Sequence, residues 1–253
     1  MNMPSNTVFE HVSELDRQTA SCLLRFIMAF ADTKHFLGRR ISEWVTAAPA
    51  MEASVAAANI TQEELGHARS LFAMARDIPG APIELNTDTD LSRKEFFNPI
   101  YLNHRWSSWF ELITTFFLLD SALTKIIASA KNSFLLPLRQ RVAKILQEEH
   151  FHAIYTKGWI VRLAATGDEG KKQLNAAIDR VWPIATAWFG PPDDQTFQPL
   201  LETGIFGNSL PIQNSQWQKE VNSVLAANGL SASQTEINWS NWNALRREIT
   251  REN

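Results

Sequence analysis

The sequence predicts an all-α fold, a four-helix bundle followed by further helices. Three observations support this prediction. Glycine is scarce, at 10 of 253 residues, and long stretches contain neither glycine nor proline. The long helical segments group into two hairpins joined by a loop, as in a four-helix bundle. The spacing Glu-x-x-His occurs twice, once in each hairpin, at Glu64–His67 and Glu149–His152.

The breaks between the long segments have chemical causes. Pro49 suits the start of a helix. Residues 77–92 (DIPGAPIELNTDTDLS) combine proline, glycine and short polar residues, which is typical of a loop. A turn is expected before Pro137, and ATGDEGKK ends the last segment. The expected bundle helices are 13–47, 50–77, 106–131 and 135–166.

The C-terminal part differs in composition. Five of the nine tryptophans lie from residue 182 onward, among Pro-, Gly- and polar-rich stretches. We expect a bundle over residues 1–170 that carries the site, and a helical extension over 171–253 that packs on it. A partner-binding surface is the alternative reading of the extension. Its expected helices are 171–188, interrupted by Pro183, 214–228 and 238–251.

Composition narrows the class of protein. The net charge of −3 gives no indication of nucleic-acid binding. The single cysteine, Cys22, forms no internal disulfide and fits a cytoplasmic location. The polar N-terminal residues do not resemble a signal peptide. The apolar stretch CLLRFIMAFA is too short to cross a membrane.

Both Glu-x-x-His pairs are predicted to face the bundle interior. Residues three apart lie on one face of a helix. Glu64 and His67 share their stripe with Ile60 and Leu71, whereas Glu63 lies on the opposite stripe. The second pair has apolar neighbours at Val142 and Ile145, and Glu148 lies with Arg141 and Lys144. Glu63 and Glu148 are therefore expected to face water.

Asp120 lies in the apolar stretch FFLLDSAL and is predicted to be buried. A carboxylate buried alone is costly, so it requires a metal, a cation or a proton. Asp120 lies 14 residues before the turn near residue 134, and Glu149 lies 15 residues after it. The two acids should therefore meet at the same level on facing helices.

The first hairpin is less regular. Glu64 lies 15 residues beyond the turn near residue 49, and the matching position on the first helix is Lys34. Asp32 is near this level, whereas Glu43 is about 13 Å away along the helix. Asp32 is therefore the preferred fourth acid. Lys34 could point into the acids as a salt-bridge partner, or extend outward to water.

Di-iron carboxylate proteins have a characteristic arrangement in a four-helix bundle. Two helices contribute one acid each, and each of the other two contributes a Glu-x-x-His pair. Carboxylates can bridge two iron ions, and imidazoles complete their coordination while positions stay open for dioxygen. The sequence thus predicts an iron site, with two ions expected and one ion or none as the alternatives. Its candidate ligands are Asp32, Glu64, His67, Asp120, Glu149 and His152.

Several segments resemble the phenylacetyl-CoA epoxidase (phenylacetic acid catabolic) family. They are LGRRISEWVTAAPAMEASVAAANITQEELGHARSLF, LLDSAL, QEEHFH and AAIDRVWPIATAWF. RISEW and the Trp-Pro helix are most similar to the structural subunit of that family. QEELGH and QEEHFH are most similar to the catalytic, di-iron subunit. The resemblance implies a ferritin-like bundle, with the Glu-x-x-His residues and Asp120 as metal ligands.

The resemblance also implies a function. Members of the family act on coenzyme A thioesters of aromatic acids, receive electrons from a reductase, and associate through their helical subunits. It places the first-helix glutamate of the catalytic subunit at Lys34. We therefore expect an iron-dependent oxygenase subunit that forms homo- or hetero-oligomers. The alternative is a catalytically silent scaffold subunit of such an oxygenase.

Overall fold

A computed structural model describes residues 7–81, 93–233 and 237–250. Residues 82–92, in the expected interhairpin loop, and residue 251, at the end of the last expected helix, lie outside this range. The fold is all-α apart from one small hairpin, as predicted. Its long elements are α1 (Arg17–Ser42), α2 (Met51–Ala75), α5 (Leu136–Ala164), α6 (Asp168–Ala187) and α8 (Leu210–Ala227). The shorter ones are η1 (Val12–Glu14), η3 (Ile100–Asn103), α3 (Trp109–Thr115), η4 (Phe116–Asp120), α4 (Ser121–Ala128), α7 (Gln198–Glu202) and η5 (Trp239–Asn241).

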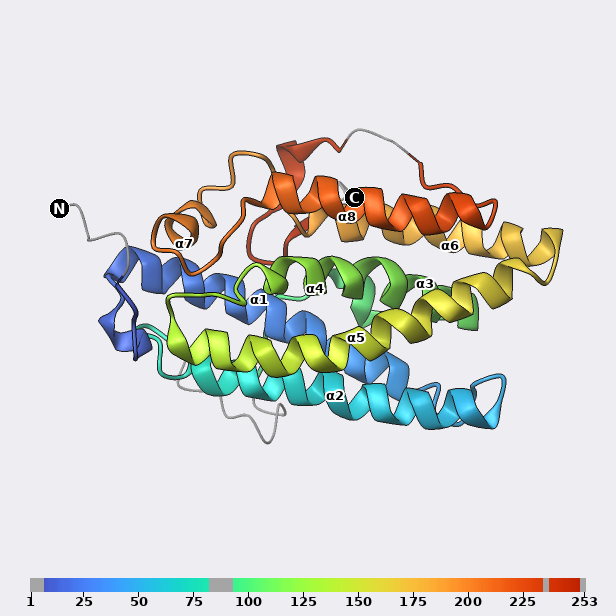
Figure 1. Cartoon of the computed structure of the whole chain (residues 1–253), viewed down its shortest axis with the longest axis horizontal. Helices are drawn as coiled ribbons and strands as arrows, with labels where there is room; N and C mark the ends of the chain where they lie inside the picture. Colours follow the sequence, from blue (N-terminus) through green and yellow to red (C-terminus); the bar gives the residue numbers. More distant parts are fainter. Residues whose placement is uncertain (1–6, 82–92, 234–236, 251–253) are drawn as a thin grey trace.

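The four bundle helices are α1, α2, α5 and the composite helix α3–η4–α4 (Figure 1). α1 contacts α2, α2 contacts α5, α5 contacts α4, and η4 closes the ring against α1. The start of α1 is set by Asp16, whose carboxylate accepts from the backbone N–H groups of Gln18 and Thr19 at 2.9 and 3.0 Å. The expected start at residue 13 is four residues too early, because η1 and this cap precede the helix.

Gly38 allows α1 to approach α2 closely. A Cβ atom at this position would lie 3.0 Å from the Leu65 side chain and 3.2 Å from the Cβ of Glu64. At these distances the side chains of α2 would have to move by a few tenths of an ångström. The absence of a side chain at residue 38 therefore brings α1 against the part of α2 that carries Glu64.

The third bundle helix is not a uniform α-helix. Ser108 caps its start by accepting from the N–H of Glu111 at 3.2 Å. The segment Phe116–Asp120 is then π-helical, and α4 follows without a break in the chain direction. Insertions of this type in α-helices are frequent at functional sites. Asp120 is the last residue of the π-helical segment.

α6 and α8 lie along the side of the bundle opposite α2 (Figure 1). α6 contacts α3, η4 and α5, and α8 contacts α4. α6 runs through Pro183 to Ala187, so the expected interruption there is wrong. Packing on three bundle elements supports this helix despite the N–H that proline lacks. The division of the chain at residue 170 stays a prediction.

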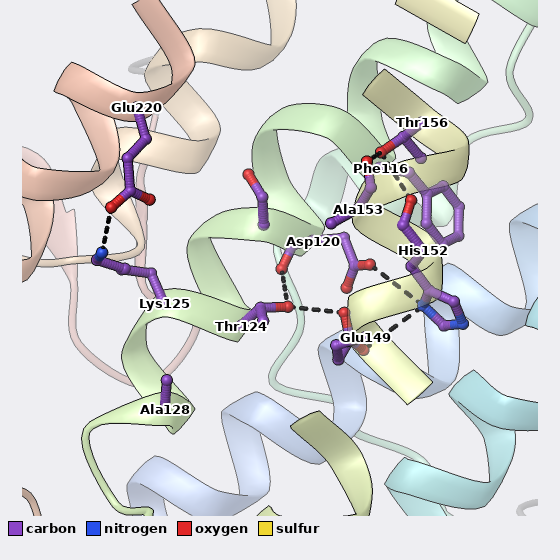
Figure 2. Close-up of a pocket in the computed structure, with 11 residues that line it drawn as sticks. Phe116, Asp120, Thr124, Lys125, Ala128, Glu149, His152, Ala153, Thr156 and Glu220 are labelled. Atoms are coloured by element: carbon purple, nitrogen blue, oxygen red, sulfur yellow. Dashed lines mark hydrogen bonds and ion pairs between the residues drawn. The ribbon is translucent and has the colours of Figure 1, made fainter. Parts of the chain in front are cut away.

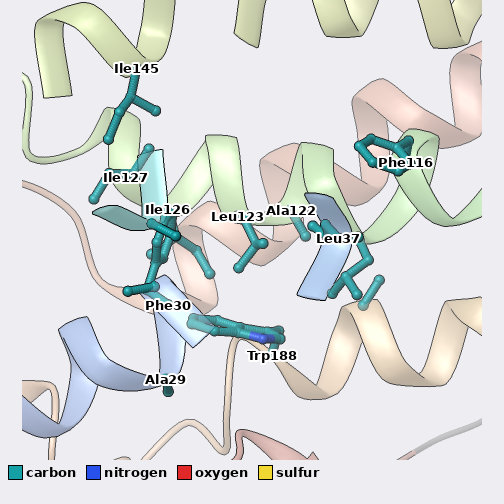
Figure 3. Packing of buried hydrophobic residues seen from close by; sticks show 14 of the residues in the cluster. Ala29, Phe30, Leu37, Phe116, Ala122, Leu123, Ile126, Ile127, Ile145 and Trp188 are labelled. Carbon is teal, nitrogen blue, oxygen red and sulfur yellow. The ribbon is translucent and has the colours of Figure 1, made fainter. Parts of the chain in front are cut away.

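Trp188, which directly follows α6, joins the bundle core (Figure 3). Phe30 of α1 meets Trp188 edge to face, with ring centroids 5.7 Å apart. Leu123 and Ile126 of α4 are fully buried in the same cluster. An edge-to-face aromatic pair contributes about 0.5–1.5 kcal/mol beyond the burial of its area. The C-terminal residues therefore share one core with the bundle.

The expected final helix, 238–251, is also wrong in its described part. η5 is followed by a two-stranded antiparallel hairpin of β1 (Trp242–Asn243) and β2 (Glu248–Ile249). Arg247 anchors this hairpin: its guanidinium is buried and donates to the carbonyl of Trp188 and to Asp194. This tertiary contact outweighs the helical tendency of the segment. No helix in the described ranges is long and apolar enough to span a membrane.

Candidate metal centre

The structure brings Glu64, Asp120, Glu149 and His152 together inside the bundle. One potential ligand atom from each of the four lies within 4.8 Å of the others. All four residues are almost completely buried. Glu64 comes from α2, Asp120 from η4, and Glu149 and His152 from α5. The predicted match in level of Asp120 and Glu149, on the two helices of the second hairpin, is confirmed.

His67 completes the cluster from α2. Its Nδ1 lies 3.3 Å from Glu149 Oε1 and 3.7 Å from Glu64 Oε1. The Nδ1 of His152 lies 3.4 Å from Glu64, 3.6 Å from Glu149 and 3.7 Å from Asp120. Neither Nδ1 atom has a hydrogen-bond partner in the described chain, nor has Glu64 Oε2. Five of the predicted ligands are thus neighbours.

Two acids that were expected to face water contact the outer ring nitrogens of the two histidines. His67 Nε2 lies 2.7 Å from Glu148 Oε2 on α5, and His152 Nε2 lies 2.7 Å from Glu63 Oε2 on α2. The expectation for Glu63 and Glu148 is corrected: α2 and α5 are antiparallel neighbours, and each acid reaches the histidine of the facing helix. In both motifs the ligand glutamate is preceded by a second glutamate, Glu63 or Glu148. This repeated Glu-Glu-x-x-His pattern was the signal in the sequence for the contact with the histidine.

Lys34 points into the cluster. Its side chain is fully buried, and its Nζ lies 3.1 Å from Glu64 Oε1. The same ammonium makes close contacts with Asp120 and Glu149. Of the two orientations left open by the sequence, the inward one is therefore observed.

The structure does not bring Asp32 into this group. Arg93 donates to both of its carboxylate oxygens at 2.6 and 2.8 Å, and the N–H of Phe97 donates at 2.8 Å. Residues two apart point to different sides of a helix, so Asp32 and Lys34 cannot both face the cluster. Glu43 lies elsewhere, in contact with Arg40 and Arg105.

The charges of the cluster support one another. Burial alone would lower the pKa of Lys34, but Asp120, Glu149 and Glu64 raise it well above its usual value. Burial and Asp120 would raise the pKa of Glu64, yet Lys34 and the histidines lower it to about 2. Burial would likewise raise the pKa of Glu149, which Lys34 holds at about 2. Without metal, Glu64 and Glu149 are therefore ionised and balanced by cations.

The pKa values of the two histidines are shifted in the opposite direction, upward. Burial would lower the pKa of His67, but its contacts with Glu149 and Glu64 raise it to about 9. Burial would also lower the pKa of His152, and Asp120 and Glu64 raise it to about 11. Both imidazoles are protonated at neutral pH in the metal-free cluster. A metal ion at Nδ1 would displace this proton.

These shifts predict the pH dependence of the metal-free protein. The contribution of Glu64 and Glu149 is present above pH 4.5 and is lost as the pH falls toward 2. The contribution of His67 is complete below pH 6.5 and is lost as the pH rises through 9. We expect the free energy of unfolding, measured with denaturant, to fall on both sides of this window, by up to about 1.4 kcal/mol per pH unit and group.

The matched variant is His67→Gln, which should reduce the alkaline decline between pH 6.5 and 9. Equal alkaline profiles for this variant and the native protein would contradict the raised pKa of His67.

A cavity of about 220 Å³ opens onto the cluster between α4 and α5 (Figure 2). Asp120, Glu149 and His152 form its inner end, and Phe116 and Ala153 belong to its walls. Thr124 also borders the cavity, and its hydroxyl donates to Glu149 Oε2 at 2.7 Å. The ion pair Lys125–Glu220, 2.6 Å long, joins α4 to α8 beside it. The sequence contained no distinct signal for this cavity.

The donor set fits a metal ion. A histidine that binds a metal usually donates its other ring N–H to a carboxylate, which fixes the ring and its tautomer. Here both rings direct Nδ1 toward buried carboxylates and Nε2 toward an outer carboxylate. A helical bundle with this interior defines the class of ferritin-like carboxylate proteins.

The chain belongs to the phenylacetic acid catabolic protein family, whose sequence pattern matches residues 3–244. Two subunits of the 1,2-phenylacetyl-CoA epoxidase of Escherichia coli (strain K12) are similar to it. The C component of that enzyme is 24% identical over 199 residues, which is 79% of each chain. The A component is 30% identical over 156 residues, 60% of this chain and 49% of its own length. These relatives belong to an oxygenase, which supports an oxidoreductase role.

Proposed function

We propose that this chain is an iron-dependent oxygenase subunit that oxidises an aromatic acyl-CoA or a similar thioester. The observation that carries the proposal is the orientation of the two histidines. Each buried Nδ1 faces the acid cluster without a hydrogen bond in the described chain, and each Nε2 contacts an outer carboxylate. Ion pairing with Lys34 alone does not account for this arrangement.

The residues that would bind iron are drawn from the cluster Glu64, His67, Asp120, Glu149 and His152. Ferrous iron supplies the capacity to bind and reduce dioxygen. The chain orients the ligands: Glu63 and Glu148 hold the imidazoles, and Thr124 holds one oxygen of Glu149. The apolar bundle around the cluster excludes water from the reacting groups.

The cavity beside the cluster is the proposed place of the substrate's reacting part. Cavities of about 150 Å³ accommodate benzene, so about 220 Å³ suffices for a ring or a short acyl group. A whole coenzyme A thioester is much larger, and its nucleotide part would remain outside. Because the relatives are two different subunits of one enzyme, we further propose a hetero-oligomeric complex that receives electrons from a reductase.

A second candidate function is a catalytically silent scaffold subunit. The specific observation in its favour is Lys34, whose buried ammonium already contacts three of the acids. The two functions differ in metal content. After anaerobic loading with ferrous iron and removal of free metal, the oxygenase subunit retains iron, whereas the scaffold remains empty.

Blocking the cavity should slow turnover without removing the metal. Ala153→Phe places a ring at the cavity wall, and we expect product formation from aromatic acyl-CoA to fall by about tenfold or more because the substrate is displaced. Iron content should be unchanged. Product is measured by mass spectrometry with a reductase or a chemical reductant. Ala143→Phe, an exposed site on the same helix, is the control and should retain activity.

A further inference from the structure

The charge at position 34 sets how many metal ions the cluster can accept. We propose that the cluster takes a single divalent cation, because the ammonium of Lys34 supplies positive charge that a second ion would bring in a two-ion site. This inference rests on the proposed function, which assigns a metal to the cluster. It departs from the two ions expected from the sequence pattern.

The donor geometry is that of one ion. Metal–oxygen and metal–nitrogen bonds of about 2.1 Å place opposite ligands about 4.2 Å apart. One donor atom from each of Glu64, Asp120, Glu149 and His152 lies within 4.8 Å of the others. His152 is 2% exposed, and its Nδ1 is directed into the group without a hydrogen-bond partner in the described chain.

Charge balance gives the same number. The three inner carboxylates carry a charge of −3, and Lys34 contributes +1. One divalent ion brings the sum of these fully buried groups to zero when both imidazoles are neutral. Glu63 and Glu148 lie outside this sum, because their side chains are 21% and 24% exposed and water screens their charge. Two divalent ions would leave +2 in a buried site, which is strongly unfavourable. In the usual two-ion pattern, a fourth carboxylate removes this excess.

Lys34 cannot remove its charge by moving to water without a rearrangement of the core. Its side chain is fully buried, and it starts on the face of α1 that packs against the cluster. Metal binding therefore requires the ammonium to give up some of its contacts with the acids while it stays inside the bundle. This competition should also weaken metal binding.

The two histidines should then differ in their importance for metal binding. His152 approaches Glu64, Asp120 and Glu149, whereas His67 approaches only Glu64 and Glu149. The single ion should be held by the His152 side of the cluster. His152→Gln is expected to lose the metal, and His67→Gln to retain one ion per chain.

The experiment counts metal per chain by elemental analysis after anaerobic loading with Fe²⁺ and, separately, Mn²⁺. We expect one ion in the native protein and two in Lys34→Glu, which restores a fourth carboxylate. Lys125→Glu, at an ion pair beside the cavity, should remain at one. The Mn²⁺-loaded native protein should show the electron paramagnetic resonance spectrum of an isolated ion, which tests the inference even if Lys34→Glu does not fold.

Two ions in the native protein, or the spectrum of a coupled Mn²⁺ pair, would overturn the inference and leave the proposed oxygenase intact. A folded Lys34→Glu variant that holds only one ion would overturn the inference as well. An empty native protein would instead refute the proposed function, and the inference with it.

Discussion

Lys34→Met should destabilise the metal-free protein by about 3–5 kcal/mol, the usual cost of removing one partner from a buried charge cluster. The side chain is fully buried, and its ammonium contacts Glu64, Asp120 and Glu149. Methionine fills a similar volume, so the loss reports charge rather than packing. The measurement is denaturant unfolding near pH 6, where the three acids need a positive partner.

The matched control is Lys125→Met. This lysine also forms a short ion pair, 2.6 Å from Glu220, but the glutamate side chain is 64% exposed. Exposed ion pairs contribute less than about 1 kcal/mol. Similar small losses at both lysines would show that Lys34 does not neutralise the cluster. Addition of a divalent metal should restore part of the stability of Lys34→Met, because the ion takes over the role of the ammonium.

Asp32→Asn should lower the free energy of unfolding by about 3–5 kcal/mol, because it leaves the guanidinium of Arg93 without its charged partner. Asp32 is 0% exposed and binds Arg93 through both oxygens. Its third contact, with the N–H of Phe97, fastens the segment around residue 97 to α1. The metal content should not change, since the carboxylate faces away from the cluster.

Asp120→Asn is the appropriate comparison, because it replaces an acid of the same type inside the cluster. This variant should lose metal, whereas Asp32→Asn should retain it. Elemental analysis and unfolding curves of both variants separate the two roles. If Asp32→Asn lost its metal while its stability stayed unchanged, Asp32 would be a ligand, as the spacing in the sequence suggested.

The sequence alone was sufficient for the features that follow from helical geometry. The i, i+3 spacing places Glu64 with His67 and Glu149 with His152 on apolar faces. Residue counts from the second turn placed Asp120 at the level of Glu149, and the structure confirms this. Such predictions succeed because rise and rotation per residue are nearly constant within a helix.

The tertiary structure decided every contact that depends on how one helix is rotated against another. Three kinds of contact were decided in this way. Lys34 points inward, and Asp32 pairs with Arg93. Glu63 and Glu148 each contact the histidine of the facing helix. Each arises between residues at least 30 positions apart in the chain. Local spacing places a residue on a face, but the neighbouring helix determines which charge that face meets.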